Sequence, residues 1–182
     1  MAIDMTTVKQ IMHNNKEVVK IEDGLGKVLW QKETGPEWHT LWNGSAWAKR
    51  TSSRSDSTYS KSTSSKFYTL PTEYTKFRFT FNYSLGNIDR SRTKFYNNGN
   101  TVDSLTSPLI IDNLKVPTYA GGVSNILGIY YAGQYSNKSF YFYLAIRINN
   151  NRELSIFAYG DNYTPGLSGT TMFTLTQIEA YY

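Results

Sequence analysis

The feature that most constrains the fold is a strict two-residue alternation of large apolar and polar side chains in two stretches. Between residues 77 and 83, phenylalanine or tyrosine occupies every second position, and polar residues fill the positions between them. Residues 140–148 repeat the pattern, with phenylalanine, leucine and isoleucine on one side and tyrosine and arginine among the residues opposite. Successive side chains of a strand point to opposite faces of a sheet, so each stretch is predicted to be a strand with one buried face.

Further candidate strands accompany these two, with turn-forming residues such as Asn149–Asn151 between them. They cover residues 109–116, 126–131, 154–159 and 172–182, and we count seven to nine strands altogether and no convincing amphipathic helix. The fifteen tyrosines agree with this assignment, because aromatic side chains favour strands. The sequence therefore predicts an all-β fold, an antiparallel β-sandwich of jelly-roll type.

The last candidate strand contains a change of parity. Phe173 and Leu175 share one parity, whereas Ile178 and Ala180 share the other. One extra residue restores the alternation, so we predict a β-bulge near Thr176–Gln177.

The chain divides near Gly35–Pro36. Before this point, three short apolar stretches separated by turn residues predict a three-stranded β-meander over residues 8–32. About 25 residues cannot build an adequate core alone, so this unit is expected to pack on something else. We therefore expect a small attachment or assembly unit at 1–35 and a β-sandwich domain at 36–182.

Residues 49–66 contain eleven serines and threonines, five lysines and arginines, and no aliphatic side chain. This composition predicts a long exposed loop or a solvated edge strand. The chain's net charge of +5 resides entirely after residue 36. Such a charge either attracts polyanions or only keeps the protein soluble.

Three of the four tryptophans lie within WHTLWNGSAW, residues 38–47. Trp42 is interpreted as a packing residue, and Trp38 is expected at the junction of the two units. Trp47 has the other parity and follows an expected turn at Asn43–Gly44, so it is our candidate contact residue in this cluster.

The residues that catalysis or metal binding would need are mostly missing. There is no cysteine, and the two histidines, His13 and His39, have no partner at metal-ligand spacing. No nucleophile elbow and no phosphate-binding loop is present. Nearly all carboxylates after residue 36 lie in polar turns or at strand ends, where such groups are ordinarily solvated. The sequence does not specify whether two of them converge across a groove, so glycoside hydrolysis stays an open alternative. We predict a non-enzymatic protein without cofactor or metal, and without membrane insertion because no long apolar run exists.

Two stretches combine stiff aromatic rings with hydrogen-bonding side chains, which is the chemistry of saccharide-binding surfaces. The candidate ligand-binding residues in them are Tyr130, Tyr131, Tyr135, Asp161, Asn162 and Tyr163. The alternative is that the tyrosines simply line sheet faces. Arg90, Arg92 and Lys94 alternate, so they are candidates for one strand face that contacts a polyanion; the alternative is a solvated surface.

Three segments resemble parts of tail and baseplate proteins of phages that infect Gram-positive bacteria. The first resembles a short N-terminal repeat of such proteins, and the other two resemble the start and the end of a C-terminal module. The matching residues are Val19, Ile21, Asp23, Gly26, Val28 and Trp30 in the first, Leu41, Trp42, Gly44, Thr69 and Leu70 in the second, and Leu175, Thr176, Ile178 and Tyr181 in the third.

The resemblance implies a virion protein, made in the host cytoplasm and assembled into the tail or baseplate. It implies a homo-oligomer, with a trimer favoured, that binds other tail or baseplate proteins and needs no cofactor. The expected ligand is a host cell-wall saccharide and not a nucleic acid. Two alternatives stay open: a purely structural virion protein without a ligand site, and a glycan-degrading tail enzyme.

Overall fold

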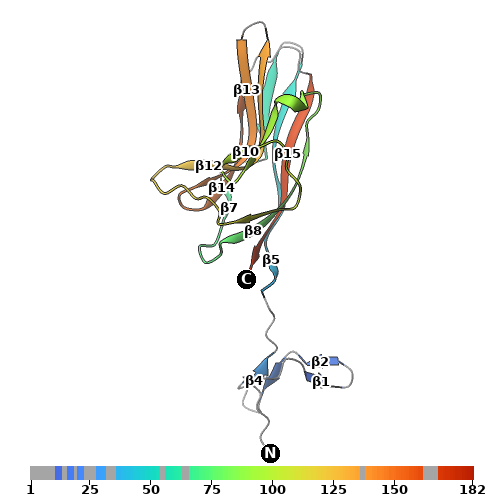
Figure 1. Cartoon of the computed structure of the whole chain (residues 1–182), viewed down its shortest axis with the longest axis vertical. Helices are drawn as coiled ribbons and strands as arrows, with labels where there is room; N and C mark the ends of the chain where they lie inside the picture. Colours follow the sequence, from blue (N-terminus) through green and yellow to red (C-terminus); the bar gives the residue numbers. More distant parts are fainter. Residues whose placement is uncertain are drawn as a thin grey trace, which may run out of the picture. The chain divides into compact units, whose positions relative to one another are not determined.

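The computed structural model divides the chain into two compact units, Met1–Glu37 and Trp38–Tyr182 (Figure 1). It describes residues 11–13, 16–18, 20–22, 28–31, 36–53, 56–62, 66–135, 138–161 and 168–182. Among these residues, every regular element is a β-strand except the 3₁₀ turn η2 (Arg90–Arg92). In this part of the chain, no helix has the length and apolar character needed to cross a membrane.

The first unit contains two antiparallel pairs of short strands. Strand β1 (Ile11–His13) pairs with β2 (Lys16–Val18), and β3 (Lys20–Glu22) pairs with β4 (Val28–Gln31). The expected three-stranded meander is therefore wrong for the described residues, which form two separate two-stranded sheets. The apolar stretch in the middle is divided between β2 and β3, and each half pairs with its own neighbour in sequence.

The second unit consists of two antiparallel sheets that pack face to face, which confirms the predicted β-sandwich (Figure 1). The six-stranded sheet runs in the order β10 (Asn100–Val102), β9 (Thr93–Asn97), β12 (Val123–Tyr135), β13 (Lys138–Asn149), β14 (Glu153–Gly160), β7 (Lys66–Thr69). The five-stranded sheet runs in the order β11 (Leu109–Asp112), β8 (Lys76–Ser84), β15 (Gly169–Tyr181), β5 (Trp38–Ser52), β6 (Ser57–Lys61). The described part of this unit has more strands than the seven to nine expected, because several strands, such as β7, β10 and β11, are too short to be recognised as an alternating stretch.

The two alternating stretches found in the sequence supply the centre of the core. In β8, Phe77, Phe79 and Phe81 are buried, and in β13, Phe142 and Leu144 are fully buried. The intervening side chains therefore point away from the core, to the outer faces of the two sheets. This parity determines which side chains are available at the surface of β13.

The predicted bulge in the last strand is confirmed. The register of β15 shifts between Leu175 and Gln177 against both of its neighbours, β8 and β5. The extra residue is Thr176, whose hydroxyl donates a hydrogen bond to the carbonyl oxygen of Thr80 (3.0 Å). Because of this extra residue, Leu175 and Ile178 both reach the core.

The expected turn at Asn43–Gly44 is not formed, because β5 continues through it as one strand. The register between Ala46 and Asn43 shifts opposite Thr176, so this segment takes part in the bulge. A Cβ atom on Gly44 would lie 2.7 Å from the ring of Trp42, so the indole lies close against the glycine backbone. Trp42 packs on Phe67 at 5.2 Å between ring centroids and against the core, as its interpretation as a packing residue required.

The polar segment 49–66 is more ordered than a long exposed loop. Strand β5 extends to Ser52, and β6 forms an edge of the five-stranded sheet. Arg50 is only 1% exposed. Its Nη2 donates to the hydroxyl of Ser57 (2.8 Å), and its guanidinium lies 4.7 Å from the ring centroid of Phe142. The segment therefore contributes to the interior through an arginine, which the absence of aliphatic side chains did not suggest.

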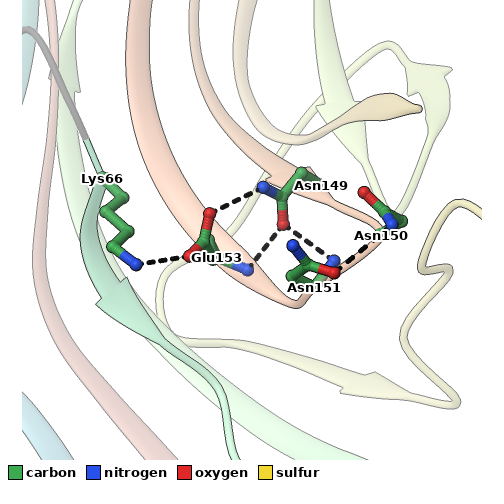
Figure 2. Close-up of polar contacts among 5 residues, drawn as sticks. All are labelled: Lys66, Asn149, Asn150, Asn151 and Glu153. Carbon is green, nitrogen blue, oxygen red and sulfur yellow. Dashed lines mark hydrogen bonds and ion pairs between the residues drawn. The ribbon is translucent and has the colours of Figure 1, made fainter. Parts of the chain in front are cut away.

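The expected turn at Asn149–Asn151 joins β13 to β14 and is fixed by side-chain hydrogen bonds (Figure 2). The Oδ1 atom of Asn149 accepts from the backbone N–H groups of Asn151 (3.0 Å) and Glu153 (2.9 Å). Its Nδ2 donates to the carboxylate of Glu153 (2.8 Å), which also pairs with the ammonium of Lys66 in β7. These hydrogen bonds, that from Lys66 first, lower the pKa of Glu153 below its usual value.

Candidate functional site

Six aromatic side chains gather on the outer face of the six-stranded sheet, and we call this surface the aromatic face. They come from four neighbouring strands: Tyr96 of β9, Tyr130 of β12, Tyr141 and Tyr143 of β13, and Phe157 and Tyr159 of β14. Strand register places them in rows. Tyr130, Tyr143 and Tyr159 lie in one row, and Tyr96 and Phe157 lie in the next, with Gly128 and Ala145 between them.

Tyr143 lies at the centre of the aromatic face and contacts four of the other rings. Its ring centroid is 5.5 Å from Phe157, 5.7 Å from Tyr159, and 6.4 Å from Tyr96 and from Tyr141. These separations lie in the range of favourable ring pairs. The rings thus hold one another in place on a sheet whose backbone is itself hydrogen-bonded on both sides of β13.

The small residues between the rings form the floor of the aromatic face. Ala145 points away from the core, yet it is fully buried, because the surrounding side chains cover it. Gly128 has a φ of +140°, and a Cβ atom there would lie 2.1 Å from the carbonyl oxygen of Leu144. Only glycine fits this position without displacing β13.

Arg147 borders the rings at the next row. Its guanidinium carbon lies 3.3 Å from the ring centroid of Phe157 and 5.3 Å from that of Tyr143. Its Nε donates to the side-chain oxygen of Asn125 (2.9 Å), and its Nη2 donates to the hydroxyl of Tyr143 (3.1 Å). Lys61 of β6 approaches the same phenyl ring, with its ammonium 5.7 Å from the centroid of Phe157.

A depression of about 410 Å³ adjoins the other end of the aromatic face. Tyr130 and Tyr141 line it together with Ala132, Gln134, Ser139 and Arg92. The depression therefore combines two tyrosine rings with amide, hydroxyl and guanidinium groups, which offer hydrogen bonds beside an apolar surface.

Tyr141 and Tyr159 are the most exposed of the six rings, at 40% and 50%. Repulsion between their two phenolate charges is the main cause that raises the pKa of Tyr141, and burial raises the pKa of Tyr96. A raised pKa favours the protonated form of Tyr141 and Tyr96, in which the phenol can donate a hydrogen bond to a ligand. The arrangement can stack on the apolar faces of sugar rings while its hydroxyl, amide and guanidinium groups bind sugar hydroxyls.

Of the candidate ligand-binding residues, the structure places Tyr130 on the aromatic face. Tyr131 points into the core, is 3% exposed and packs on Phe142, so its prediction as a ligand-binding residue is wrong. Asp161 borders the face, where its Oδ2 accepts from the backbone N–H of Tyr141 (2.8 Å). The side chain of Tyr135 lies outside the described residues, as do Asn162 and Tyr163 entirely.

Trp47 lies elsewhere, on the outer face of the five-stranded sheet, with the ammonium of Lys49 5.9 Å from its ring. Trp38 lies on the outer face of that sheet as well. Its ring is 5.2 Å from Tyr181, and the guanidinium of Arg78 is 4.6 Å from its centroid. The structure therefore does not bring Trp47 together with the tyrosines of the aromatic face.

Arg90, Arg92 and Lys94 do not share one strand face, which corrects the expectation from their alternation. Arg90 and Arg92 lie in the turn η2, and only Lys94 belongs to a strand, β9. The turn begins at Asp89, whose carboxylate accepts hydrogen bonds from the hydroxyl and backbone N–H of Ser91; these lower the pKa of Asp89. Arg92 also pairs with Asp89 (3.6 Å), and Lys94 pairs with Asp103.

Five aromatic-face residues and one cation were not among the candidates: Tyr96, Tyr141, Tyr143, Phe157, Tyr159 and Arg147. The signal for two tyrosines and the arginine was present, because they occupy the outward parity of residues 140–148. Their convergence with rings from other strands required the register. Within the described ranges, no group of three His, Asp or Glu side chains is arranged to hold a metal ion.

Comparisons with known proteins do not assign this chain. No family model matches it, and neither a curated protein nor a solved structure does.

Proposed function

We propose that the chain is a non-enzymatic virion protein, a tail-fibre or baseplate component of a phage of Gram-positive bacteria. In this proposal the aromatic face binds a saccharide of the host cell wall. The observation that carries saccharide binding is the set of six rings across four adjacent strands, two of them exposed by 40% and 50%. The virion context comes from the resemblance of three segments of the sequence to such proteins.

Three properties of the aromatic face favour a saccharide. The rings lie on a rigid sheet, so little side-chain entropy is lost when a ligand binds. The phenols and Arg147 supply hydrogen bonds around apolar ring surface. The floor of Gly128 and Ala145 lies between rings, which gives the surface relief instead of a flat aromatic layer.

A single site of this kind is expected to be weak. Several copies on one particle would convert weak sites into strong adhesion, because each later contact forms at a high effective concentration. We therefore propose that the protein acts as a homo-oligomer, with a trimer favoured, and that residues 1–37 attach it to other tail or baseplate proteins.

The test is binding to purified cell walls and wall polysaccharides from a panel of Gram-positive bacteria. Tyr141→Ala and Tyr159→Ala each remove one exposed ring, and each is expected to weaken binding roughly 3- to 10-fold. Tyr119→Ala is the matched control, because Tyr119 is 68% exposed in the segment between β11 and β12 and contacts no ring of the aromatic face.

Absence of binding to every wall in the panel would overturn the proposal. It would also fail if the Tyr141 and Tyr159 variants changed only the oligomeric state, measured by light scattering. In that case the aromatic face would be an interface between copies of the chain. Release of reducing ends from a wall polysaccharide would show an enzyme instead.

A further inference from the structure

Arg147 combines two features: it lies on the aromatic face, and none of its described partners is a carboxylate. Among the described residues, no carboxylate oxygen lies within 4 Å of its guanidinium, and its Nη1 makes no hydrogen bond. Its polar partners are neutral: the side-chain oxygen of Asn125 and the hydroxyl of Tyr143. The guanidinium is therefore held in position by neutral groups and by the ring of Phe157, while its charge stays uncompensated.

The acidic side chains of the sandwich are engaged elsewhere or lie apart from Arg147. From residue 38 on, the chain has eight Asp and Glu residues, and all eight lie in described segments. Five of them form ion pairs with other cations: Asp89 with Arg92, Asp103 with Lys94, Asp112 with Lys76, Glu153 with Lys66, and Glu179 with Arg78. The remaining three, Asp56, Glu73 and Asp161, pair with no described cation.

Lys61 adds a second uncompensated charge at the same place. Its ammonium lies 5.7 Å from the ring centroid of Phe157, and it has no ion pair among the described residues. Arg147 and Lys61 thus flank one ring of the aromatic face with two positive charges. By contrast, Lys94 and Arg92, the cations near its other end, are each paired with an aspartate.

We propose that the ligand of the aromatic face is an acidic saccharide, and that Arg147, assisted by Lys61, binds its carboxylate, phosphate or sulfate group. This inference rests on the proposed saccharide binding and goes beyond it by naming the charge of the ligand. The free edge of the guanidinium offers hydrogen bonds in a geometry that suits such oxyanions. The rings of Phe157 and Tyr143 provide the stacking surface beside it.

A nucleic acid fits this surface less well. Single-stranded nucleic acids are bound by many cations that follow the backbone, with bases stacked on open rings. Among the residues that the structure describes, two cations without a carboxylate partner approach Phe157, and most of the rings pack on one another. Two charges suit a saccharide that carries an occasional acidic group.

The experiment measures binding of the full chain to three matched pairs of immobilised polysaccharides and to a single-stranded DNA oligonucleotide. Polygalacturonate and its methyl ester test the carboxylate, dextran sulfate and dextran test the sulfate, and phosphomannan and mannan test the phosphate. We expect at least one acidic member to bind about ten-fold or more tightly than its neutral partner, with affinity falling as salt rises.

Arg147→Gln is expected to weaken that binding roughly 10-fold or more, and Arg147→Lys to restore part of it. Lys94→Gln is the matched control: it removes one positive charge from the same sheet, but that charge is paired with Asp103. Binding by Lys94→Gln within about two-fold of the unmodified chain would show that position, and not net charge, is decisive. Thermal melting of each variant verifies that it folds.

Four outcomes would overturn the inference: equal binding of the neutral partners, no binding of any acidic member, preference for the DNA, or no effect of Arg147→Gln. The proposed saccharide binding can stand when the acidic ligand is wrong. This is the outcome if neutral wall saccharides bind, Tyr141→Ala weakens their binding, and Arg147→Gln leaves it unchanged.

Discussion

Gly128→Ala tests the close approach of β12 to β13 under the aromatic face. The added Cβ would lie 2.1 Å from the carbonyl oxygen of Leu144 and 2.7 Å from the Cα of Ala145. Both atoms are backbone of the neighbouring strand, so no side-chain rotation relieves the contact. Overpacking of this kind costs about 1–3 kcal/mol, and a φ of +140° adds about 1–3 kcal/mol for alanine. We expect a total loss of roughly 3–5 kcal/mol.

Gly121→Ala is the matched control, because Gly121 also has a positive φ, +75°, but nothing within 4 Å of an added Cβ. Its cost is the left-handed backbone alone, about 1–2 kcal/mol. At about 3 °C per kcal/mol for a unit of this size, Gly128→Ala should lower the melting temperature by roughly 9–15 °C and Gly121→Ala by roughly 3–6 °C. Calorimetry measures both. If the two variants melt within about 2 °C of each other, the reasoning about the close approach is wrong.

Two further predictions concern packing and pH. Trp42→Ala should lower the free energy of unfolding by about 2–4 kcal/mol, because Trp42 packs on Phe67 and the core. Trp47→Ala should lower it by less than about 1 kcal/mol. Urea unfolding measures both, and the reverse order of the two losses would contradict this reasoning. Hydrogen bonds from Lys66 and Asn149 lower the pKa of Glu153 in the folded chain. Their contribution to stability is therefore complete above the pKa of an ordinary glutamate, about 4.3. It is lost as the pH falls through the lower pKa of the folded state. Glu153→Gln should therefore flatten the acid side of the stability profile, and an unchanged profile would refute the assignment.

The sequence predicted the sandwich well where side chains alternate strictly. The strands around Phe79 and Phe142 follow directly from their two-residue period, and the parity change of the last strand located the bulge at Thr176. Segment 49–66 was harder because its composition lacks aliphatic residues. Arg50 is nevertheless buried against Phe142, because a ring and the hydroxyl of Ser57 accommodate its guanidinium. Residue composition predicts the burial of apolar side chains, but it does not predict the burial of a charged side chain such as Arg50.

The candidate site was only partly predictable for a different reason. The sequence around Tyr130 predicts a contact residue there, but its neighbour Tyr131 faces the core on the same strand. The residues beside Tyr130 are Tyr96 and Tyr143, and Tyr159 continues the same row one strand further on. Alternation tells which face a side chain takes, whereas strand order and register decide which residues share a row. Neither is specified by the period of a single strand.

The two outer faces of the sandwich explain why cations near aromatic rings do not all make equivalent sites. On the five-stranded sheet, Arg78 lies 4.6 Å from the ring of Trp38, but its Nε and Nη2 also bind the carboxylate of Glu179 at 2.5 and 2.6 Å. The opposite charges cancel, and the side chain of Glu179 is only 9% exposed, so an incoming anion would have to displace a partly buried carboxylate. Arg147 makes the same type of ring contact with Phe157, and neutral partners leave its charge available. An anionic ligand should therefore bind at Arg147 in preference to Arg78, because of the carboxylate that one arginine has and the other lacks.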